Sequence, residues 1–353
     1  MKHTKKIGAL SVAAALALSL AAPAAAAEYT VQSGDSLRKI AREQLGDGTR
    51  WGELYEANRD TIRDPRLIYA GQVLQVPDRP EADVPAAPQE VPAAEAQTQT
   101  EKALALINTF ATGDTETAAA LLDEHYIQHN LAYGTGEAAF LSSVEALAAA
   151  PVRTTVHNIR AFEDGDYVFL QTVYNFAGAG EQVAFDIFRF DADGEIAEHW
   201  DNLTALAGEN PSGHTQIDGA MEITDLDKTE ENRELVENFL YDVMHGNNPE
   251  KTADYFDGDT YIQHNTAIAD GVSGLNAALA ALAEQGIQMI YDETHMVLAQ
   301  GNFVLAVSEG TYGGAPTSYY ELWRVENGKI AEHWDVMETI ADASTWQNEN
   351  GKF

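Results

Sequence analysis

The segment YIQHN occurs twice in this chain, at Tyr126–Asn130 and again at Tyr261–Asn265. About seventy residues after each copy comes a second repeated segment, IAEHWD, at Ile196–Asp201 and at Ile330–Asp335. The two pairs are offset by 135 and 134 positions, nearly the same distance along the chain. Two such identities, in the same order and at one offset, indicate a duplicated domain of about 110 residues.

Each copy shows a helical pattern followed by strand-like segments. In the first copy, apolar residues recur at helical spacing from Ala103 to Leu122, and runs rich in Val, Phe, Tyr and Ile fill residues 152–203. The second copy repeats this order, with its strand-like runs between residues 287 and 337. Helices followed by a four-stranded antiparallel meander indicate an α+β fold, in which helices pack on one face of a curved, cone-shaped sheet.

Composition places five further segments around the two copies. We expect a signal peptide at 1–27, a small domain at 28–77, a Pro/Ala/Glu-rich linker at 78–100, the first copy at 101–206, a second linker at 207–228, the second copy at 229–343 and a tail at 344–353. The first linker carries four prolines and no hydrophobic periodicity, so it is expected to be extended and to reach roughly 70 Å at about 3.1 Å per residue.

The first 27 residues have the three parts of a secretory signal. Three lysines precede the apolar segment Ile7–Leu20, and the small residues of Pro23–Ala27 offer a cleavage site. The apolar segment is shorter than the about 20 residues that span a membrane. We therefore expect an exported protein, in the periplasm or at the cell wall, that has no membrane contact after cleavage; an uncleaved anchor is the alternative.

Bulk composition restricts the class of protein. The 353 residues include no cysteine, which excludes disulfides, thiolate metal sites and a cysteine nucleophile. The net charge of −35 becomes −38 once the three lysines of residues 1–27 are removed. Such a negative field repels nucleic acid and anionic membranes, so we expect neither as a partner.

Residues 28–77 predict a compact unit with the order strand, helix, helix, strand. The segments Tyr29–Leu37 (YTVQSGDSL), Tyr55–Asn58 (YEAN) and Ile68–Leu74 (IYAGQVL) resemble a LysM domain over the whole unit. The resemblance implies binding to a glycan that contains N-acetylglucosamine, most simply peptidoglycan. It also implies that two loops hold the sugar through Gly34, Asp35, Ser36, Asp64, Ile68 and Tyr69. A LysM fold that packs on its neighbours and binds no glycan is the alternative.

The last hairpin of the first copy places a polar cluster on one face. Because side chains alternate along a strand, a loop of even length puts Asp186 on the same face as His199 and Asp201. Arg189 and Glu198 then share the opposite face and can pair across the two strands.

The second copy predicts the same arrangement by a different turn. Its loop is one residue shorter, and a type I turn with a bulge at Gly328 is typical of such a sequence. The odd length again groups Glu321 with His333 and Asp335. On the other face the expected pair is Arg324 with Glu332.

Two carboxylates and an imidazole on one face suit general acid–base chemistry. A carboxyl group near another carboxylate and under an apolar lid has its pKa raised towards neutrality, and a neighbouring imidazole can relay a proton. We expect His129 and His264, from the YIQHN segments, to close over this face. The alternative is a solvated cross-strand network without a chemical role.

The same residues resemble a known family. Both copies are similar to SnoaL-like polyketide cyclase domains of the nuclear transport factor 2-like fold, through YIQHN, the strands Asp186–Phe190 and Glu321–Val325, and the two IAEHWD segments. The resemblance implies cone-shaped domains and, in relatives that are enzymes, an aspartate that acts as acid and base in an aldol closure without metal or cofactor. By motif these aspartates are Asp201 and Asp335.

The resulting candidate site residues are Asp201, His199, His129 and Asp186 in the first copy and Asp335, His333, His264 and Glu321 in the second. We expect no metal and no cofactor. A set of His129, His199 and a carboxylate could alternatively hold a metal ion. Trp200 and Trp334 are expected in the core or between sheets.

Three functional hypotheses remain open from the sequence. In the first, a peptidoglycan-associated protein uses its two cones to bind small, largely apolar ligands. In the second, one or both cones catalyse cofactor-free aldol, isomerisation or dehydration chemistry. A purely structural wall protein would leave the polar face unexplained. Because this fold often pairs sheet to sheet, we also expect the two copies to form an internal pseudo-dimer.

Overall fold

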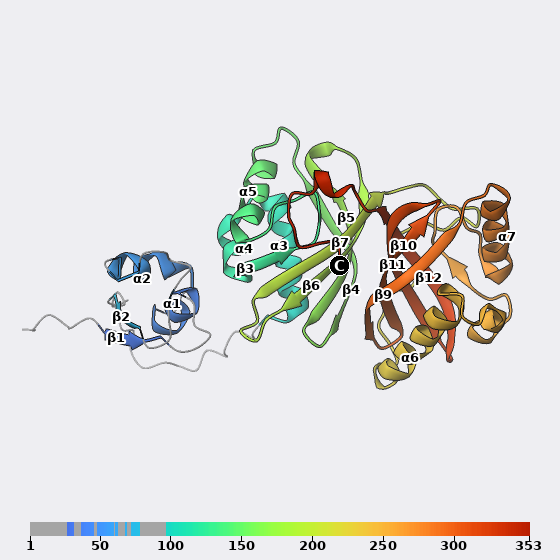
Figure 1. The fold of residues 1–353 in the computed structure, drawn as a ribbon, viewed down its shortest axis with the longest axis horizontal. Helices are drawn as coiled ribbons and strands as arrows, with labels where there is room; N and C mark the ends of the chain where they lie inside the picture. Colours follow the sequence, from blue (N-terminus) through green and yellow to red (C-terminus); the bar gives the residue numbers. More distant parts are fainter. Residues whose placement is uncertain are drawn as a thin grey trace, which may run out of the picture. The chain divides into compact units, whose positions relative to one another are not determined.

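A computed structural model describes residues 27–31, 37–45, 48–59, 61–62, 68, 72–77 and 97–353. The chain divides into two compact units, residues 1–88 and residues 89–353, and each is described by itself (Figure 1). The proposed signal peptide, apart from Ala27, and most of the first linker lie outside the described residues. In the described part of the chain, no helix is long and apolar enough to cross a membrane.

The N-terminal unit has the expected order of strand, helix, helix, strand. Strand β1 (Ala27–Thr30) pairs antiparallel with β2 (Val73–Val76), and helices α1 (Leu37–Leu45) and α2 (Trp51–Ala57) lie between them in sequence, with the 3₁₀ turn η1 (Gly48–Arg50) before α2. Ile40, Leu54 and Leu74 are fully buried in its core. The Asn58 side chain fastens α2 to β2, because it donates to the carbonyls of Leu54 and Gln75 and accepts from the backbone of Gln75.

The first cone consists of four helices or turns and five strands. These are α3 (Gln99–Thr112), α4 (Thr115–Leu121), β3 (Leu122–Gln128), α5 (Glu137–Ala148), β4 (Thr155–Asp164), β5 (Tyr167–Asn175), η2 (Phe176–Gly178), β6 (Gln182–Phe190) and β7 (Ile196–Ala205). Helix α3 begins with a capping box between Thr98 and Glu101 and ends at Gly113, whose φ of 76° is the left-handed conformation that glycine adopts without strain.

The second cone repeats this plan. Its elements are η3 (Leu226–Lys228), α6 (Thr229–Phe239), the π-helical turn η4 (Leu240–Met244), η5 (Pro249–Tyr255), β8 (Ile262–Gln263), α7 (Gly271–Glu284), β9 (Met289–Gln300), β10 (Phe303–Tyr312), β11 (Ala315–Glu326) and β12 (Lys329–Thr339). A final 3₁₀ turn, η6 (Ala343–Thr345), begins the C-terminal tail.

Each sheet has one strand more than the sequence predicts. The strand orders are β3-β7-β6-β5-β4 and β8-β12-β11-β10-β9, and the additional strands β3 and β8 each contain part of a YIQHN segment. They pair parallel with the IAEHWD strands, where the backbone of His129 donates to His199 and that of His264 donates to His333. The two repeated segments of each copy are therefore neighbours in space.

The turn predicted for the second hairpin is wrong, although the predicted facing of its side chains is correct. Asn327 and Gly328 both have positive φ, 52° and 70°, so the hairpin closes with a two-residue type I′ turn. The bulge lies instead on β12, where Ala331 is the additional residue opposite Arg324 and Val325, and Ala197 of β7 forms a bulge at the matching place in the first cone. Each bulge adds the residue that keeps the polar face in register.

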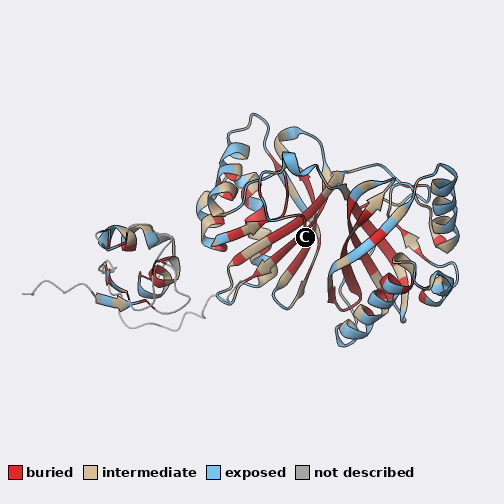
Figure 2. Cartoon of the chain, in the orientation of Figure 1, coloured by how far each residue is buried: buried red, intermediate tan, exposed pale blue. Residues whose placement is uncertain are grey.

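The two sheets face each other, and helices cover their outer faces (Figure 1). Aromatic and aliphatic side chains from both sheets form one buried cluster between them, which includes Trp200 and Trp334 as expected. Figure 2 shows buried residues along the facing strands and exposed residues on the outer helices. Asn202 of β7 joins the sheets by donating to the carbonyls of Ser318 and Val336 at 2.9 and 2.8 Å.

The linker and the tail each cross to the opposite cone. Asn210, in the linker that follows the first cone, donates to the carbonyl of Gln263 in the second. In the tail that follows the second cone, Asn348 donates to the carbonyls of Asn130 and Tyr133 in the first. Each YIQHN segment is thus held by the extension of the other copy.

Candidate functional site

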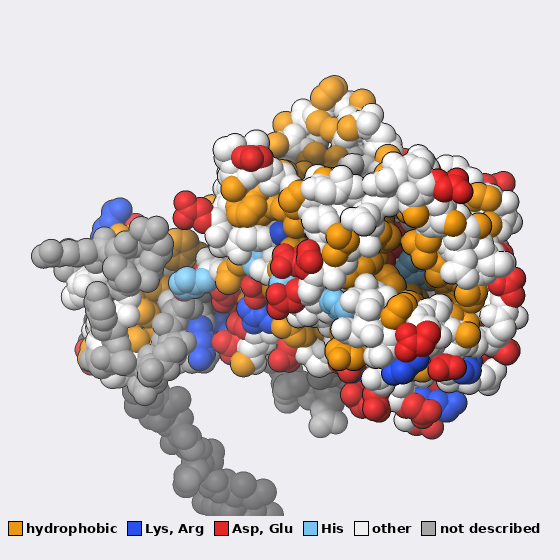
Figure 3. Space-filling view, turned by 45° about the vertical axis from the view of Figure 1, so that its right-hand side comes forward, with side chains coloured by type: hydrophobic (Ala, Val, Ile, Leu, Met, Phe, Trp, Pro, Cys, Tyr) orange, Lys and Arg blue, Asp and Glu red, His pale blue; other side chains and the backbone are white. Residues whose placement is uncertain are grey.

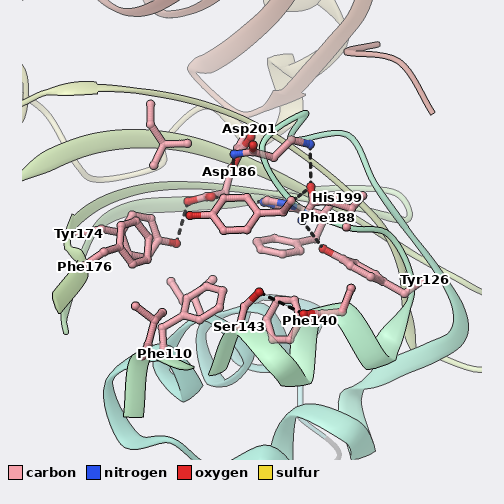
Figure 4. A pocket seen from close by; sticks show the side chains of 18 residues that line it. Phe110, Tyr126, Phe140, Ser143, Tyr174, Phe176, Asp186, Phe188, His199 and Asp201 are labelled. Carbon is pink, nitrogen blue, oxygen red and sulfur yellow. Dashed lines mark hydrogen bonds and ion pairs between the residues drawn. The ribbon is translucent and has the colours of Figure 1, made fainter. Parts of the chain in front are cut away.

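A cavity of about 60 Å³ lies between the sheet and the helices of the first cone. Its lining is mainly aromatic and apolar and is contributed by α3, α5 and the concave face of the sheet (Figure 4). Asp186, His199 and Asp201 all line it, as the alternation of side chains predicts. On the opposite face Arg189 pairs with Glu198 at 2.7 Å, which confirms the expected cross-strand pair.

Most polar groups of this first cavity are paired with one another, although Oδ1 of Asp201 is buried without a hydrogen-bond partner among the described residues. Tyr174 donates to Asp186 at 3.0 Å, and the other oxygen of Asp186 lies 3.3 Å from Nε2 of His199. Asn130 donates to Asp201 at 2.9 Å. Burial raises the pKa of Asp186, and its contact with His199 opposes that rise.

A glutamine fixes the tautomer of the histidine in each cavity. Oε1 of Gln128 accepts from the backbone of Asn130 at 2.8 Å, so this atom is the oxygen, and Nδ1 of His199, 3.0 Å away, must donate to it. The second cone repeats the arrangement, with Gln263 between the backbone of Asn265 and Nδ1 of His333, at 2.9 Å from each. In both cones Nε2 is therefore the ring nitrogen that faces the cavity.

The second cone encloses a much larger cavity of about 420 Å³. In Figure 3 hydrophobic side chains surround a hollow in the second cone, the part turned forward. The cavity is lined by Phe239, Val243, Met244, Tyr261, Gln263, Asn265, Ala267, Ile268, Leu275, Ala278, Leu279, Ala281, Leu282, Gln285, Met289, Tyr291, Tyr312, Glu321, Trp323, His333, Asp335 and Met337. No lysine or arginine is among these lining residues, so the site offers no cation to an anionic ligand.

The polar groups of the second cavity are not all paired. Tyr291 donates to Oε1 of Glu321 at 2.5 Å, and Asn265 donates to Asp335 at 2.7 Å. Within the described residues, Oε2 of Glu321 and Nε2 of His333 are buried and have no hydrogen-bond partner. Such atoms are costly inside a protein, which makes them candidates for contact with a ligand.

Burial separates the protonation states of these three groups. It raises the pKa of Glu321 to about 8 and that of Asp335 to about 6, and it lowers the pKa of His333 to about 3, with the charge of His264 contributing. Near neutral pH the second cavity therefore holds a protonated carboxyl, an ionised carboxylate and a neutral imidazole. A donor and a base lie directly opposite each other, because Glu321 and Asp335 are paired in register.

The tyrosine that donates to the buried carboxyl group comes from a different strand in each cone, and this change accounts for much of the difference between the two cavities. In the first cone Tyr174 of β5 lines the cavity and donates to Asp186. The matching position of β10 is Gly310, and the donor is instead Tyr291 of the neighbouring strand β9, its register partner. A side chain at position 310 is excluded, since its Cβ would meet the Ile290 carbonyl oxygen at 1.9 Å.

The expected position of His129 and His264 is not the observed one. Neither residue lines either of these two cavities; both lie on the other face of the sheet, stacked on Trp200 and Trp334 at 4.8 and 4.6 Å. Each pairs through Nε2 with the glutamate of IAEHWD, because the YIQHN backbone runs parallel to that strand and alternation turns the histidine away from the cavity. The alternative metal set of His129, His199 and a carboxylate is not assembled.

On this face of the second sheet, which is turned towards the first sheet, Glu332 is held by three donors. Burial alone would raise the pKa of Glu332, yet hydrogen bonds from His264 and Arg324 lower it. Nε of Arg324 donates at 2.6 Å, which confirms the predicted pair. The backbone of Ala220 in the linker also donates to this carboxylate.

The sequence did not predict the residues that form hydrogen bonds to the carboxyl and imidazole groups of these clusters. Gln128, Gln263, Asn130 and Asn265 lie inside the repeated YIQHN segment, so the repetition itself was a signal for them. Tyr291 carried no such signal, because its counterpart in the first copy is Val156, which has no hydroxyl group. In the N-terminal unit, the predicted sugar residues Gly34, Asp35, Ser36, Asp64 and Tyr69 lie outside the described residues, and Ile68 packs against the core.

Comparison with solved structures finds nuclear transport factor 2-like folds. One is a protein of this fold from Cytophaga hutchinsonii, 18% identical, covering 31% of this chain and 94% of that chain with a TM-score of 0.27. Another is wild-type IdmH from Streptomyces antibioticus, a candidate polyketide cyclase, 21% identical, covering 30% and 92% with a TM-score of 0.26. A third, from Catenulispora acidiphila, has a ketosteroid isomerase-like fold and is 20% identical, covering 30% and 85% with a TM-score of 0.26.

Comparison with curated proteins finds the potassium binding protein Kbp of Escherichia coli O6:H1. It is 41% identical over 59 residues, which is 16% of this chain and 40% of Kbp. The chain therefore spans less than half of the length of this relative.

Family profiles match both parts of the chain. The LysM domain profile matches residues 29–77, and the SnoaL-like domain profile matches residues 103–199 and 236–333. The two SnoaL-like matches together cover more than half of the chain and contain the YIQHN segments and most of each IAEHWD segment. The chain accordingly belongs to the SnoaL-like family, with two tandem domains of that family behind a LysM domain.

Proposed function

We propose that the second cone binds a small, largely apolar and uncharged molecule that carries a carbonyl or hydroxyl group. The observation behind this proposal is the 420 Å³ cavity, whose apolar walls surround the unpaired atoms Oε2 of Glu321 and Nε2 of His333. An apolar pocket with a few convergent polar groups is the usual form of a small-molecule site. The first cone, with 60 Å³ and, among its described lining atoms, a single unpaired carboxylate oxygen, Oδ1 of Asp201, has much less room for a ligand.

Binding can be tested with 2-naphthol, which has an apolar body and one hydroxyl group. We expect isothermal titration calorimetry to detect one site on the purified protein. Ala278→Trp, which fills the second cavity, should abolish binding, whereas Ala139→Trp, at the wall of the first cavity, should leave it unchanged. Binding that survives Ala278→Trp would place the ligand elsewhere and refute the proposal.

A second candidate function is acid–base catalysis in the same cavity. It is favoured by the raised pKa values of Glu321 and Asp335, about 8 and about 6, on facing positions. Glu321 would donate a hydrogen bond to a substrate carbonyl while Asp335 removes a proton from the adjacent carbon and returns it to another. Such proton transfer typically contributes about 10²–10⁴-fold in rate.

Proton abstraction can be followed without knowing the natural substrate. We expect the protein to accelerate deuterium exchange at the α-carbons of 2-tetralone, measured by NMR in D₂O. Asp335→Asn should remove the acceleration, and Asp201→Asn in the first cone should not. If 2-naphthol binds but exchange stays at the buffer rate, the cavity binds and does not catalyse.

We further propose that the protein is exported and associated with the cell wall. The LysM domain supports this, since such domains generally bind glycans containing N-acetylglucosamine. The protein should co-sediment with purified peptidoglycan, and a variant lacking residues 28–77 should remain in the supernatant. Equal sedimentation of both proteins would exclude the LysM domain as the wall-binding part.

A further inference from the structure

A cluster of histidine and carboxylate groups lies outside both cavities, where the linker meets the second YIQHN segment. It consists of His214 and Asp218 of the linker and His264 of YIQHN, with one ligand atom of each within 4.8 Å of the others. The two carboxylate oxygens of Asp218 each lie near Nδ1 of one ring. Its Oδ1 lies 2.7 Å from Nδ1 of His264, and its Oδ2 lies 3.7 Å from Nδ1 of His214.

The outer nitrogen of each ring is held by a further carboxylate. Nε2 of His264 lies 2.9 Å from Glu332, and Nε2 of His214 lies 3.2 Å from Asp270. Histidines that bind metals almost always donate their second ring N–H to such an oxygen, which fixes the tautomer and the ring orientation. With Nε2 engaged in both residues, the two Nδ1 atoms face Asp218.

The groups are held in place by contacts that do not involve a ligand. The His264 ring is stacked on Trp334, and the indole N–H of Trp334 donates to the backbone carbonyl of Asp218 at 2.9 Å. The guanidinium of Arg160, from the first cone, donates to the same carbonyl. The next residue, Gly219, has φ +90°, and a Cβ there would meet Glu332. These contacts therefore hold the linker in one position against His264.

The first cone lacks this cluster, which provides an internal comparison. His129 matches His264 and also binds the glutamate of IAEHWD through Nε2. Its Nδ1 faces the backbone carbonyl of Gly351 at 3.0 Å, as Nδ1 of His264 faces that of Thr215, but Nδ1 of His264 also has the Asp218 carboxylate 2.7 Å away. The shared half of the arrangement is thus structural, and the additional histidine and aspartate occur only beside the second copy.

We propose that His214, Asp218 and His264 form a site for a divalent transition-metal ion of the zinc class. Two imidazoles and one carboxylate favour such ions over Mg²⁺ and Ca²⁺, which prefer sets made only of oxygen. The side chains of His214 and Asp218 are 31% and 43% exposed, which gives an ion access and leaves room for water ligands. In the metal-free protein Nδ1 of His264 carries a proton that it donates to the carbonyl of Thr215 at 2.8 Å, so binding of the ion must release this proton to solvent. The bound ion would fasten the linker to the second cone and would not depend on chemistry in either cavity.

Calorimetry with Zn²⁺ on the purified protein, carrying no polyhistidine tag, tests the proposal. We expect one ion per chain, and we expect Co²⁺ to give visible absorption bands characteristic of nitrogen and oxygen ligands. His214→Ala and Asp218→Asn should each weaken Zn²⁺ binding by at least about tenfold. Asp270→Asn, which removes only the outer partner of His214, should weaken it by about 10–100-fold.

The matched control is His295→Ala. His295 lies near Glu293 and Glu309 in one of the other groups with metal-like spacing, and its loss should leave Zn²⁺ affinity unchanged. Circular dichroism of each variant shows whether it is folded. Absence of Zn²⁺ binding by the parent protein, unchanged affinity in folded His214→Ala, or loss of binding in folded His295→Ala would each overturn the proposal.

Discussion

Glu321 and Asp335 face each other on neighbouring strands, and both are buried as carboxyl groups in an apolar cavity. The pKa of Glu321 rises from 4.5 to about 8, so the folded protein binds more protons than the unfolded chain between these values. Stability must then fall as pH rises through this window. The pKa of Asp335, raised from 3.8 to about 6, adds a loss of the same sign at lower pH.

Glu321→Gln should therefore flatten the pH dependence of stability. The amide keeps an oxygen for Tyr291 but cannot ionise. Between pH 4.5 and pH 9 the free energy of unfolding of the variant should therefore rise relative to that of the parent protein by on the order of 4 kcal/mol. Urea unfolding at a series of pH values measures this. Glu284→Gln, on the exposed end of α7, is the control and should follow the parent curve. Parallel curves for Glu321→Gln and the parent would mean that Glu321 is ionised in the folded state.

Gly310 should tolerate no side chain. A Cβ at this position would meet the carbonyl of Ile290 at 1.9 Å, and a backbone atom inside a sheet cannot move aside cheaply. We expect Gly310→Ala to lower the free energy of unfolding by at least about 1–3 kcal/mol. Ser308→Ala, two residues earlier on the same strand, should cost less, because it removes atoms instead of adding them. Equal stability of Gly310→Ala and the parent would show that β9 and β10 separate easily.

Alternation along strands correctly predicted Asp186, His199 and Asp201 on one face, although the loop has an odd length instead of the predicted even one and the bulge in β7 restores the facing. Alternation could not place Tyr291, which reaches Glu321 from a non-adjacent strand across a glycine. His129 was misplaced for a related reason. Its direction depends on β3 pairing with β7, and that pairing is a long-range fact that the YIQHN segment alone does not contain.

At the scale of elements, the C-terminal tail stabilises a loop of the first cone through hydrogen bonds. Asn348 is buried and donates to two carbonyls of the loop after β3, at 2.9 Å each. Asn348→Ala would leave both carbonyls without that donor, so we expect a loss of about 1–3 kcal/mol in the free energy of unfolding. Amide hydrogen exchange at residues 128–133 should also become faster. The neighbouring Glu349 is exposed, and Glu349→Ala should change stability by less than about 0.5 kcal/mol. If the two variants behave alike, the tail does not support the loop.

Helices and long strands followed from periodicity, and the polar linker and tail did not reveal their contacts. Asn210 and Asn348 resemble ordinary loop residues in sequence. Each becomes structural because the opposite cone presents backbone carbonyls at or just after the end of its parallel strand. These hydrogen-bond partners come together only when both cones are folded. Composition alone therefore could not distinguish the two segments from a solvated linker and an unattached C-terminal tail.

At the scale of the molecule, we expect the two cones to behave as an internal pseudo-dimer and unfold together. The buried cluster between the sheets takes aromatic and aliphatic residues from both copies, and Asn202 adds hydrogen bonds across it.

Ile187, fully buried in this cluster, belongs to the first cone. Ile187→Ala should cost about 2–5 kcal/mol, and the loss should appear in the slowest-exchanging amides of both cones. Ile40→Ala, in the core of the LysM unit, should leave those amides unchanged, since residues 1–88 form a separate compact unit. Hydrogen exchange with mass spectrometry resolves the three regions in one experiment. Faster exchange confined to the first cone would mean that the copies fold as independent domains. Each cone would then be stable before its sheet packs against the other sheet.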